Sequence, residues 1–597
     1  MILISPRLSR IFFDRRDPSQ YFFTDPYDFC VQRPEDVIFT NTLSPFTNLT
    51  YYKGGGSRDG EERFKSYFAI NANKKLGFGF YIDYLYGRGL YQDQSTAFFN
   101  GGLFSSYRGD KYDMHFIFNN DNLKMAENGG ITDDRYITNP LDMAEGKKEY
   151  SANEIPTRLS QIWNHNTSYH AFLTHRYNLG FYKEKQDSVD TDSVKITQVF
   201  VPVTSFIHTL QVDLNNRKYI SYDDAQNQKY FEHNYLGTDS IDKTKRTSIK
   251  NTIGIALQEG FNKWAKAGLT AFLSYEYRNF ALTDTTNIPG QRIINNYKES
   301  SLSIGGELSK KQGKLLHYNI LGELAIAGED AGQFSVEGRG DLNLRLFGDT
   351  VRLDVNAFIK NQNPVFYFRH FQSKHYWWDN NDLSKIMRTR LEGKLSLDRW
   401  GTQLRAGVEN IKNYTYLANT SIPVKDSEGN VTGFKNNAAV RQHSGNIQIF
   451  TAMLQQKLKV GIFHLDGEVA YQKSSEQDIL PLPELSAYGN LYMKFGLAKK
   501  VLQIEMGADV RYFSKYYAPD YSPVIGQFYN QNPDDKIEIG AFPIVNVYAN
   551  LHLKRTRFFI MMYHVNAGSG KSNYFLAPHY PINPRMIKFG LSWNFFD

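Results

Sequence analysis

Apolar and polar residues alternate along most of this chain. In one segment, Leu342, Leu344 and Leu346 share one face of an extended chain, while Asp341 and Arg345 lie on the other. Because successive side chains of a β-strand point to opposite faces, this period of two predicts strands. The same division recurs over residues 351–359, 502–512 and 545–553. In all of these strands we expect the charged side chains on one face only.

The end of the chain carries the most regular example of this pattern. One face holds the apolar and aromatic residues Ile587, Phe589, Leu591, Trp593 and Phe595. Polar residues such as Lys588 and Ser592 fall on the opposite face. A C-terminal strand of this kind is typical of the closing strand of an outer-membrane β-barrel. We therefore predict that residues 586–596 close a barrel, with their aromatic face against lipid.

The connections between the predicted strands alternate between short and long. Short connections include 108–110, 309–314, 398–401, 498–500 and 554–557. Long connections include 122–165, 215–248, 361–385, 415–444, 514–540 and 568–585. Outer-membrane barrels have short periplasmic turns and long extracellular loops, whereas a soluble β-sandwich has no reason to sort its connections in this way. The sequence therefore predicts an all-β fold. Residues 43–597 should form a transmembrane antiparallel β-barrel of about 22 strands, with a strand number of roughly 18–24.

Residues 1–42 do not join this series of strands. They are aromatic and interrupted by proline, as at Pro18 and in Tyr21–Phe29. We expect them either to line the lumen or to add an edge strand. The start at Met1 lacks the basic region and the apolar core of about 7–15 residues that define a secretory signal peptide. Either the signal peptide is absent because this start is truncated, or the interpretation as an exported protein is wrong.

The composition fits a membrane location that is carried by strands. Hydrophobic residues make up 41% of the chain and the mean hydropathy is -0.50, and no run approaches the roughly 18–20 apolar residues that a transmembrane helix needs. Aromatic residues reach 15%, which fits the aromatic girdles of a barrel but also a large soluble all-β protein. Lys and Arg exceed Asp and Glu by 69 to 62 in an interleaved pattern, which argues against a nucleic-acid surface. The single cysteine, Cys30, excludes an internal disulfide framework.

A set of polar and charged side chains is expected to project into the lumen. It comprises Asp341, Arg345, Arg352, Asp354, Lys494, Glu505, Asp509, Arg511, His552 and Lys554. Facing rows of opposite sign would produce a transverse field that favours small polar solutes and tunes ion preference. Alternatively, these groups pair with one another and only keep the lumen hydrated. No catalytic, cofactor or metal site is predicted.

One long connection combines histidine with several aromatic residues. His370 and His375 lie there with Trp377, Trp378 and Asp379. This grouping would suit a metal ion or the face of a sugar ring. We favour a solvated loop that its aromatic residues anchor at the membrane rim, because such spacing outside a helix is weak evidence for metal ligands.

Four segments carry a resemblance to a known family: Tyr27–Phe29, Pro45–Gly54, Phe64–Asn71 and Gly101–Ser106. Together with the aromatic C-terminal strand and the alternating loops, they resemble the putative porin family of Bacteroidota outer membranes over nearly the whole chain. The resemblance implies an integral outer-membrane barrel that acts as a channel for small hydrophilic solutes or ions and not as an enzyme. The expected partners are outer-membrane lipid, the barrel assembly machinery during insertion, and the solutes.

Two other functions remain open at this stage. About 22 strands is also the size of barrels that carry a plug, so the chain could be a TonB-type transporter barrel whose N-terminal part is missing. The barrel could also be a non-conducting scaffold whose long loops bind partner proteins or glycans.

Overall fold

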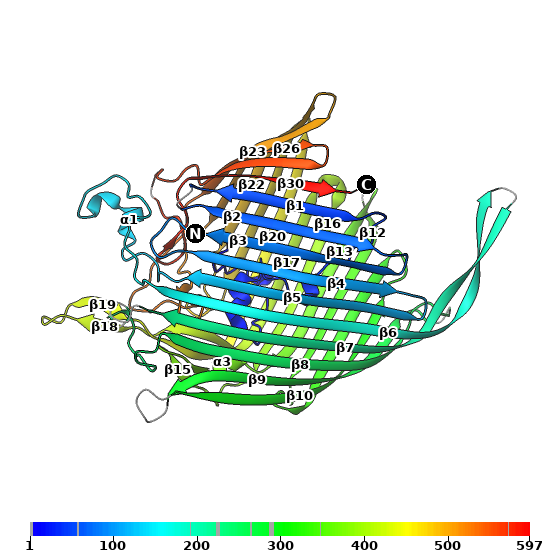
Figure 1. The fold of residues 1–597 in the computed structure, drawn as a ribbon, viewed down its shortest axis with the longest axis horizontal. Coiled ribbons are helices and arrows are strands. Elements are labelled where there is room, and N and C mark those ends of the chain that lie inside the picture. Colours follow the sequence, from blue (N-terminus) through cyan, green and yellow to red (C-terminus); the bar gives the residue numbers. More distant parts are fainter. Residues whose placement is uncertain are drawn as a thin grey trace.

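The strands of the computed structural model form one closed β-barrel (Figure 1). The structure describes residues 4–56, 59–190, 193–222, 227, 229–262, 265–285, 292–346, 348–570 and 572–596. Within these residues the main sheet contains 22 strands, and each strand is antiparallel to its neighbours. The first strand, β1 (Phe46–Gly54), pairs with the last, β30 (Met586–Phe595), and this pairing closes the sheet. The predicted all-β antiparallel barrel and its strand number are confirmed.

The barrel strands follow one another round the wall in chain order. After β1 come β2 (Glu61–Asn71), β3 (Leu76–Gly87), β4 (Thr96–Arg108), β5 (Tyr112–Ala126), β6 (Ile162–Asp190), β7 (Ser193–Ser221), β8 (Ile241–Leu257), β9 (Gly268–Thr285), β10 (Arg292–Lys310) and β11 (Leu316–Gly328). The wall continues with β12 (Phe334–Leu346), β13 (Asp349–Gln362), β16 (Ile386–Leu397), β17 (Thr402–Asn419), β20 (Ala438–Val460), β21 (Phe463–Ser474), β22 (Leu485–Leu497), β23 (Leu502–Phe513), β26 (Ile544–Leu553) and β27 (Thr556–Tyr563) before β30.

The alternating sequence pattern sets which side chains face lipid. Leu491 in β22 and Ile253 in β8 are 58% and 57% exposed, because the outer surface of the isolated barrel has no protein to cover it. In β30, Phe589 and Trp593 lie on this outward face, as predicted, while Lys588 on the opposite face is buried. A shift of register by one residue would reverse this arrangement, so the pattern fixes the register wherever lipid meets one face.

The two rims of the barrel differ in the length of their connections. At the short-turn rim, β16 and β17 are joined by the single turn Asp398–Gly401, and β26 and β27 by Lys554 and Arg555. At the long-loop rim, the β5–β6, β17–β20 and β23–β26 connections span residues 127–161, 420–437 and 514–543. One hairpin departs from this rule: β6 and β7 are 29 residues long and extend beyond the short-turn rim (Figure 1).

The long connections and the N-terminal segment contain small elements of their own. The helical ones are η1 (Phe12–Asp14), η2 (Phe22–Tyr27), η3 (Pro34–Asp36), α1 (Arg135–Thr138), η4 (Pro140–Asp142), α3 (Phe366–Arg369) and η5 (Asp398–Trp400). The short strands pair as β14 (His370–Gln372) with β15 (Trp377–Asp379), β18 (Ile422–Lys425) with β19 (Val431–Lys435), β24 (Asp520–Ser522) with β25 (Gln527–Tyr529), and β28 (Phe575–Ala577) with β29 (Tyr580–Pro581). In the described part of the chain, none of the helices has the length and apolar character needed to span a membrane.

Candidate functional site

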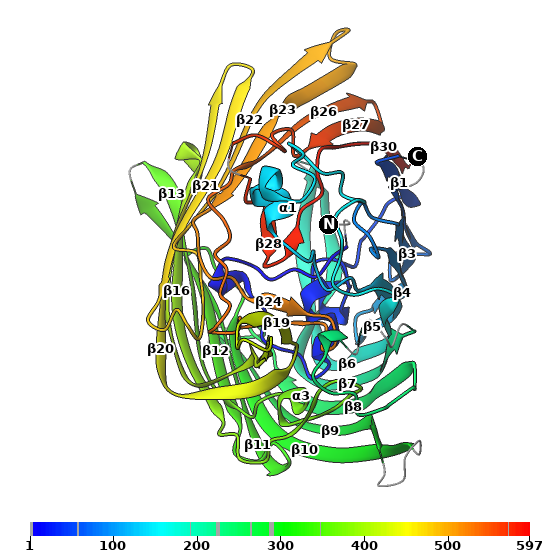
Figure 2. The same cartoon turned by 90° about the vertical axis from the view of Figure 1, so that its left-hand side faces the viewer.

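The N-terminal segment, residues 4–45, lies inside the barrel (Figure 2). Ion pairs attach it to the wall: Asp17 contacts Lys360 of β13 at 2.9 Å and also pairs with Arg388 of β16, and Asp14 pairs with Arg405 of β17. These basic side chains alternate with outward-facing residues such as Leu391 and Leu404, so they lie on the inner face. The segment forms 3-10 turns here and adds no strand to the wall.

The part of the wall that contacts this segment carries buried pairs of opposite charge. Arg388 and Arg390 both contact Glu409, at 2.7 and 2.5 Å, and the Glu409 side chain is fully buried. Arg405 contacts Glu392 at 2.9 Å. These residues were not among the predicted lining residues, although charges at every second position of β16 were a signal that could have identified them.

Aromatic side chains from the N-terminal segment, the loops and the wall pack together in the lumen. The N-terminal segment supplies Tyr21, Phe22 and Phe23, and the loops after β13 and β23 supply most of the others. This lumen core comprises Tyr21, Phe22, Phe23, Leu159, Ile162, Tyr219, Phe231, Phe280, Leu282, Phe366, Tyr367, Phe368, Phe371, Tyr376, Trp378, Leu417, Ala438, Val524, Ile525 and Tyr529. Apolar surface that would otherwise meet water in the lumen is thereby buried, which stabilises the inward fold of both loops.

The loop between β13 and β16 is central to the lumen core. The ring centroids of Phe366 and Phe280 lie 3.8 Å apart, and those of Tyr367 and Phe23 lie 4.6 Å apart. Aromatic contacts of this kind contribute about 0.5–1.5 kcal/mol each beyond their buried area. The interpretation of residues 361–385 as a solvated loop anchored at the membrane rim was wrong, because its aromatic residues pack within the barrel instead.

The two histidines of this loop have structural partners. His370 shares a 2.6 Å hydrogen bond with Asp379, and His375 shares one of 2.8 Å with the carbonyl of His233. His375 also stacks on Phe231, with 3.8 Å between ring centroids. Among the residues that the structure describes, no group of three or more His, Cys, Asp or Glu side chains is placed to hold a metal ion.

A buried polar network links the lumen core to the wall. Arg217 of β7 is 1% exposed, donates a hydrogen bond to Asn164 at 2.5 Å, and lies 4.6 Å from the ring of Phe23. Asn164 and Tyr521 both donate to the carboxyl oxygen of Glu127, at 2.6 and 2.9 Å. Burial raises the pKa of Glu127 to about 8, because the carboxylate is poorly solvated there. The network thus holds a loop, the N-terminal segment and two strands together.

The structure places most of the predicted lining residues on the inner face, in two separate sectors of the wall. In β12 and β13, Asp341 pairs with His317 at 2.8 Å and Arg352 with Asp354 at 2.8 Å, while Arg345 is exposed.

In β22 and β23, Lys494 faces Glu505 at 3.6 Å and Asp509 lies 4.0 Å from Arg511. His552 follows, on β26. Lys554 departs from the expectation: it occupies the β26–β27 turn with a φ of 52°, because the strand already ends at Leu553. The pore-lining role of the whole set stays a prediction.

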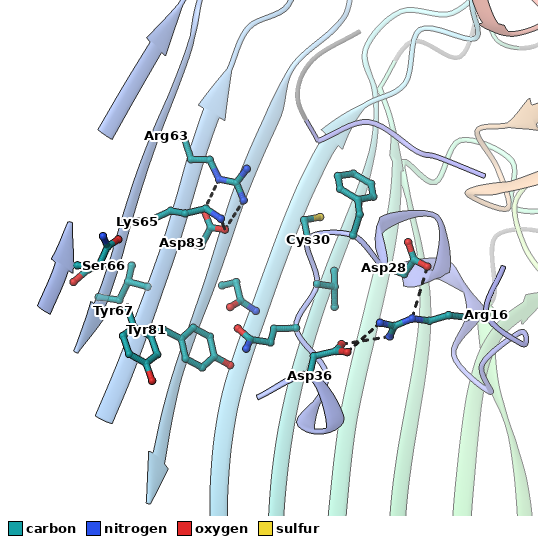
Figure 3. Close-up of a pocket in the computed structure, with 16 residues that line it drawn as sticks. Arg16, Asp28, Cys30, Asp36, Arg63, Lys65, Ser66, Tyr67, Tyr81 and Asp83 are labelled. Carbon is teal, nitrogen blue, oxygen red and sulfur yellow. Dashed lines mark hydrogen bonds and ion pairs between the residues drawn. The ribbon is translucent and has the colours of Figure 1, made fainter. Parts of the chain in front are cut away.

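A cavity separates the N-terminal segment from the first strands of the barrel (Figure 3). Its volume is about 390 Å³. On the wall side, Arg63 donates to Asp83 at 2.6 Å and Lys65 contacts the same carboxylate at 3.3 Å. On the segment side, Arg16 pairs with Asp36 at 3.0 Å, and Cys30 lies between the two groups. The cavity is therefore polar and lined by charges of both signs.

Solved structures with a similar fold are outer-membrane barrels. The siderophore receptor PirA from Acinetobacter baumannii matches with a TM-score of 0.61 at 9% identity, over 93% of this chain and 81% of that one. A mutant of the ferric enterobactin receptor PfeA from Pseudomonas aeruginosa matches with a TM-score of 0.60 at 12% identity, over 93% and 81%. The copper transporter OprC matches with a TM-score of 0.60 at 10% identity, over 94% and 81%. At such identities the likeness shows the fold alone.

No curated protein matches the chain. The closed barrel is that of an integral outer-membrane protein. A family model described as "Putative porin" matches residues 3–597, so the chain belongs to this porin family.

Proposed function

We propose that this protein is an outer-membrane channel through which small hydrophilic solutes or ions diffuse passively, along the side of the N-terminal segment. The observation that carries the proposal is the polar cavity between that segment and β1–β4. A volume of about 390 Å³ suits a small solute with its water, and charges of both signs favour hydrated solutes over apolar ones. Membership of the porin family and the outer-membrane barrel support the same function.

The inward-folded loops narrow the path in this proposal. The lumen core occupies the part of the barrel bounded by β7, β9 and β17, whereas the cavity lies against β1–β4. Solutes therefore pass on the side of the barrel where polar residues line the wall. We propose the paired residues of β12–β13 and β22–β26 as further lining groups, and we propose that the barrel assembly machinery inserts the chain.

An energised transporter is the second candidate. Its support is the N-terminal segment itself, which lies within the lumen and is attached by ion pairs at Asp14 and Asp17. Such contacts involve charged groups that water can compete for, so a force on the segment could release it.

Planar-bilayer recording separates the two candidates. Purified protein that shows heat-modifiable migration should give stable conductance steps if it is a passive channel. A folded barrel without such steps would overturn the proposal. In that case, conductance that appears after charge reversal of Asp14 and Asp17 would favour the second candidate, because the variant weakens the attachment of the segment to the wall without an energy source.

A further inference from the structure

Four lysines, Lys124, Lys218, Lys243 and Lys245, lie close together in the register of β5–β8 and on the outer face of the barrel. They are at the ends of these strands nearest the long-loop rim, and Figure 1 shows the strands themselves. In the strand register, Lys124 lies opposite His165, His165 opposite Lys218, and Lys218 opposite Lys243. The next row toward the membrane centre runs Asn122, Thr167, Asn216 and Lys245 in the same order. We call these eight residues the basic patch.

The basic patch faces outward, away from the lumen. On the same face of each strand, further from the rim, lie the exposed apolar residues Phe118, Leu214 and Ile249. The side chains between them, such as Arg217, point inward and are buried. Because period two separates the faces, the lysines share the surface that meets lipid. Lys124, Lys243 and Lys245 are themselves exposed.

The depth of the basic patch is that of lipid headgroups. It lies directly beyond the apolar belt, which is the outward surface around Phe118, Leu214 and Ile249. The Lys124 ammonium lies 5.4 Å from the ring of Trp163, and the rings of Trp163 and Tyr222 are 5.8 Å apart. Outward-facing Trp and Tyr mark the membrane interface in such barrels. Since the long-loop rim is extracellular, these headgroups belong to the outer leaflet.

The basic patch lacks a counter-charge within the described part of the protein. No ion pair joins any of its four lysines to a carboxylate there, in contrast to the outward pair Lys53 and Glu62. His165 shares a hydrogen bond with Asn122 at 3.1 Å and brings no negative charge. Like charges directly opposite each other destabilise a strand pair, and neighbouring strands are only about 4.8 Å apart. An anionic partner removes this repulsion.

We propose that the basic patch binds the phosphate-bearing headgroup of an outer-leaflet lipid. The lysines supply the charge, Asn122, Thr167 and Asn216 supply hydrogen bonds to headgroup oxygens, and the apolar belt receives the acyl chains. Charge complementarity and the position above the belt select a lipid over a soluble anion, which would gain nothing from the apolar surface. The proposal does not depend on whether the barrel conducts.

Native mass spectrometry of the detergent-solubilised protein tests the proposal. The probes are dioctanoyl phosphatidic acid, dioctanoyl phosphatidylcholine and inorganic phosphate. We expect phosphatidic acid to bind more tightly than phosphatidylcholine, and inorganic phosphate not to displace it. The triple variant Lys218→Gln, Lys243→Gln, Lys245→Gln should weaken phosphatidic acid binding by about fivefold per lysine, or roughly a hundredfold in all.

A matched control removes the same charge at the opposite rim. Lys311→Gln, Lys314→Gln, Lys499→Gln alters three exposed lysines of the short turns and should leave binding unchanged. Equal binding by the basic-patch variant and the native protein would overturn the proposal, as would an equal loss in the control variant or displacement by inorganic phosphate. If the triple variant does not fold, as judged by heat-modifiable migration, the single variant Lys124→Gln provides the same comparison.

Discussion

Lys588 in the last barrel strand donates a hydrogen bond to the carboxylate of Glu61 in the second, 527 residues away. The pair reaches across β1 and lies at the seam where the sheet closes. Its side chains are 9% and 4% exposed, so water screens the interaction little.

Replacement of Lys588 by Met should destabilise the closed barrel by about 3–5 kcal/mol, because it leaves a buried carboxylate without this cation. The measurement is the urea concentration at which heat-modifiable migration is lost. The outward pair of Lys53 and Glu62, with side chains 34% and 51% exposed, provides the control: Lys53→Gln should cost less than about 1 kcal/mol. Equal effects at the two sites would contradict the role given to burial.

Adjacent positions of β22 should lose very different amounts of stability when a charge is introduced. Leu491 is 58% exposed on the lipid face, and Leu491→Arg should cost about 2–4 kcal/mol if the position lies near the bilayer midplane. Asn490 faces the lumen, where it accepts a hydrogen bond from Tyr548 at 3.1 Å, and Asn490→Arg should cost much less. Unfolding of both variants in lipid vesicles gives the comparison, and equal losses would contradict the assigned faces.

The orientation of these faces could be predicted from the sequence, but the contents of the lumen could not. A period of two places Leu491 and Asn490 on opposite faces whatever their neighbours are. No comparable rule exists for Phe366 or Tyr367, because an aromatic loop is equally compatible with the membrane rim and with a lumen. The contacts that decide between them come from residues far away in the sequence, such as Phe23 and Phe280.

Ion preference tests whether the lining charges act on solutes. In the passive channel, Arg345→Glu with Arg352→Glu should shift the reversal potential in a salt gradient toward cations, since two positive groups become negative. The conservative variant with Lys at both positions should leave it unchanged. An unchanged potential in the Glu variant would mean that these groups only keep the lumen hydrated.

Modification of Cys30 tests the proposed path. The thiol borders the cavity, and burial raises its pKa to about 12, so reaction with a small methanethiosulfonate reagent should be slow at neutral pH and faster as pH rises. Each modification should lower the conductance, because the added group occupies the cavity. Cys30→Ser should abolish the effect. A modified channel with native conductance would place the path elsewhere.

The loops after β13 and β23, which fold into the lumen, should dock less tightly as the pH rises from 4.5 to about 8, the range over which Glu127 titrates. Its carboxyl group has an ordinary pKa of 4.5 when solvated and one of about 8 when buried, so the docked state binds a proton that the undocked state has released. Docking is therefore strongest below 4.5 and weakens progressively up to about 8. Hydrogen exchange of residues 514–543, corrected for intrinsic rates, should show this trend. Glu127→Gln keeps the acceptor oxygen and should flatten the contribution of this group.

The N-terminal segment lies inside a barrel that closes beside it, and this closure limits how the segment can enter. Residues 4–45 lie within a wall whose first strand directly follows them and whose first and last strands are joined to each other. Once β1 and β30 have paired, the segment has no sideways exit and can move only along the barrel axis. Before the seam forms the segment can enter the lumen sideways, and afterwards it can enter only along the axis, so the last pairing of the sheet limits how the lumen is filled.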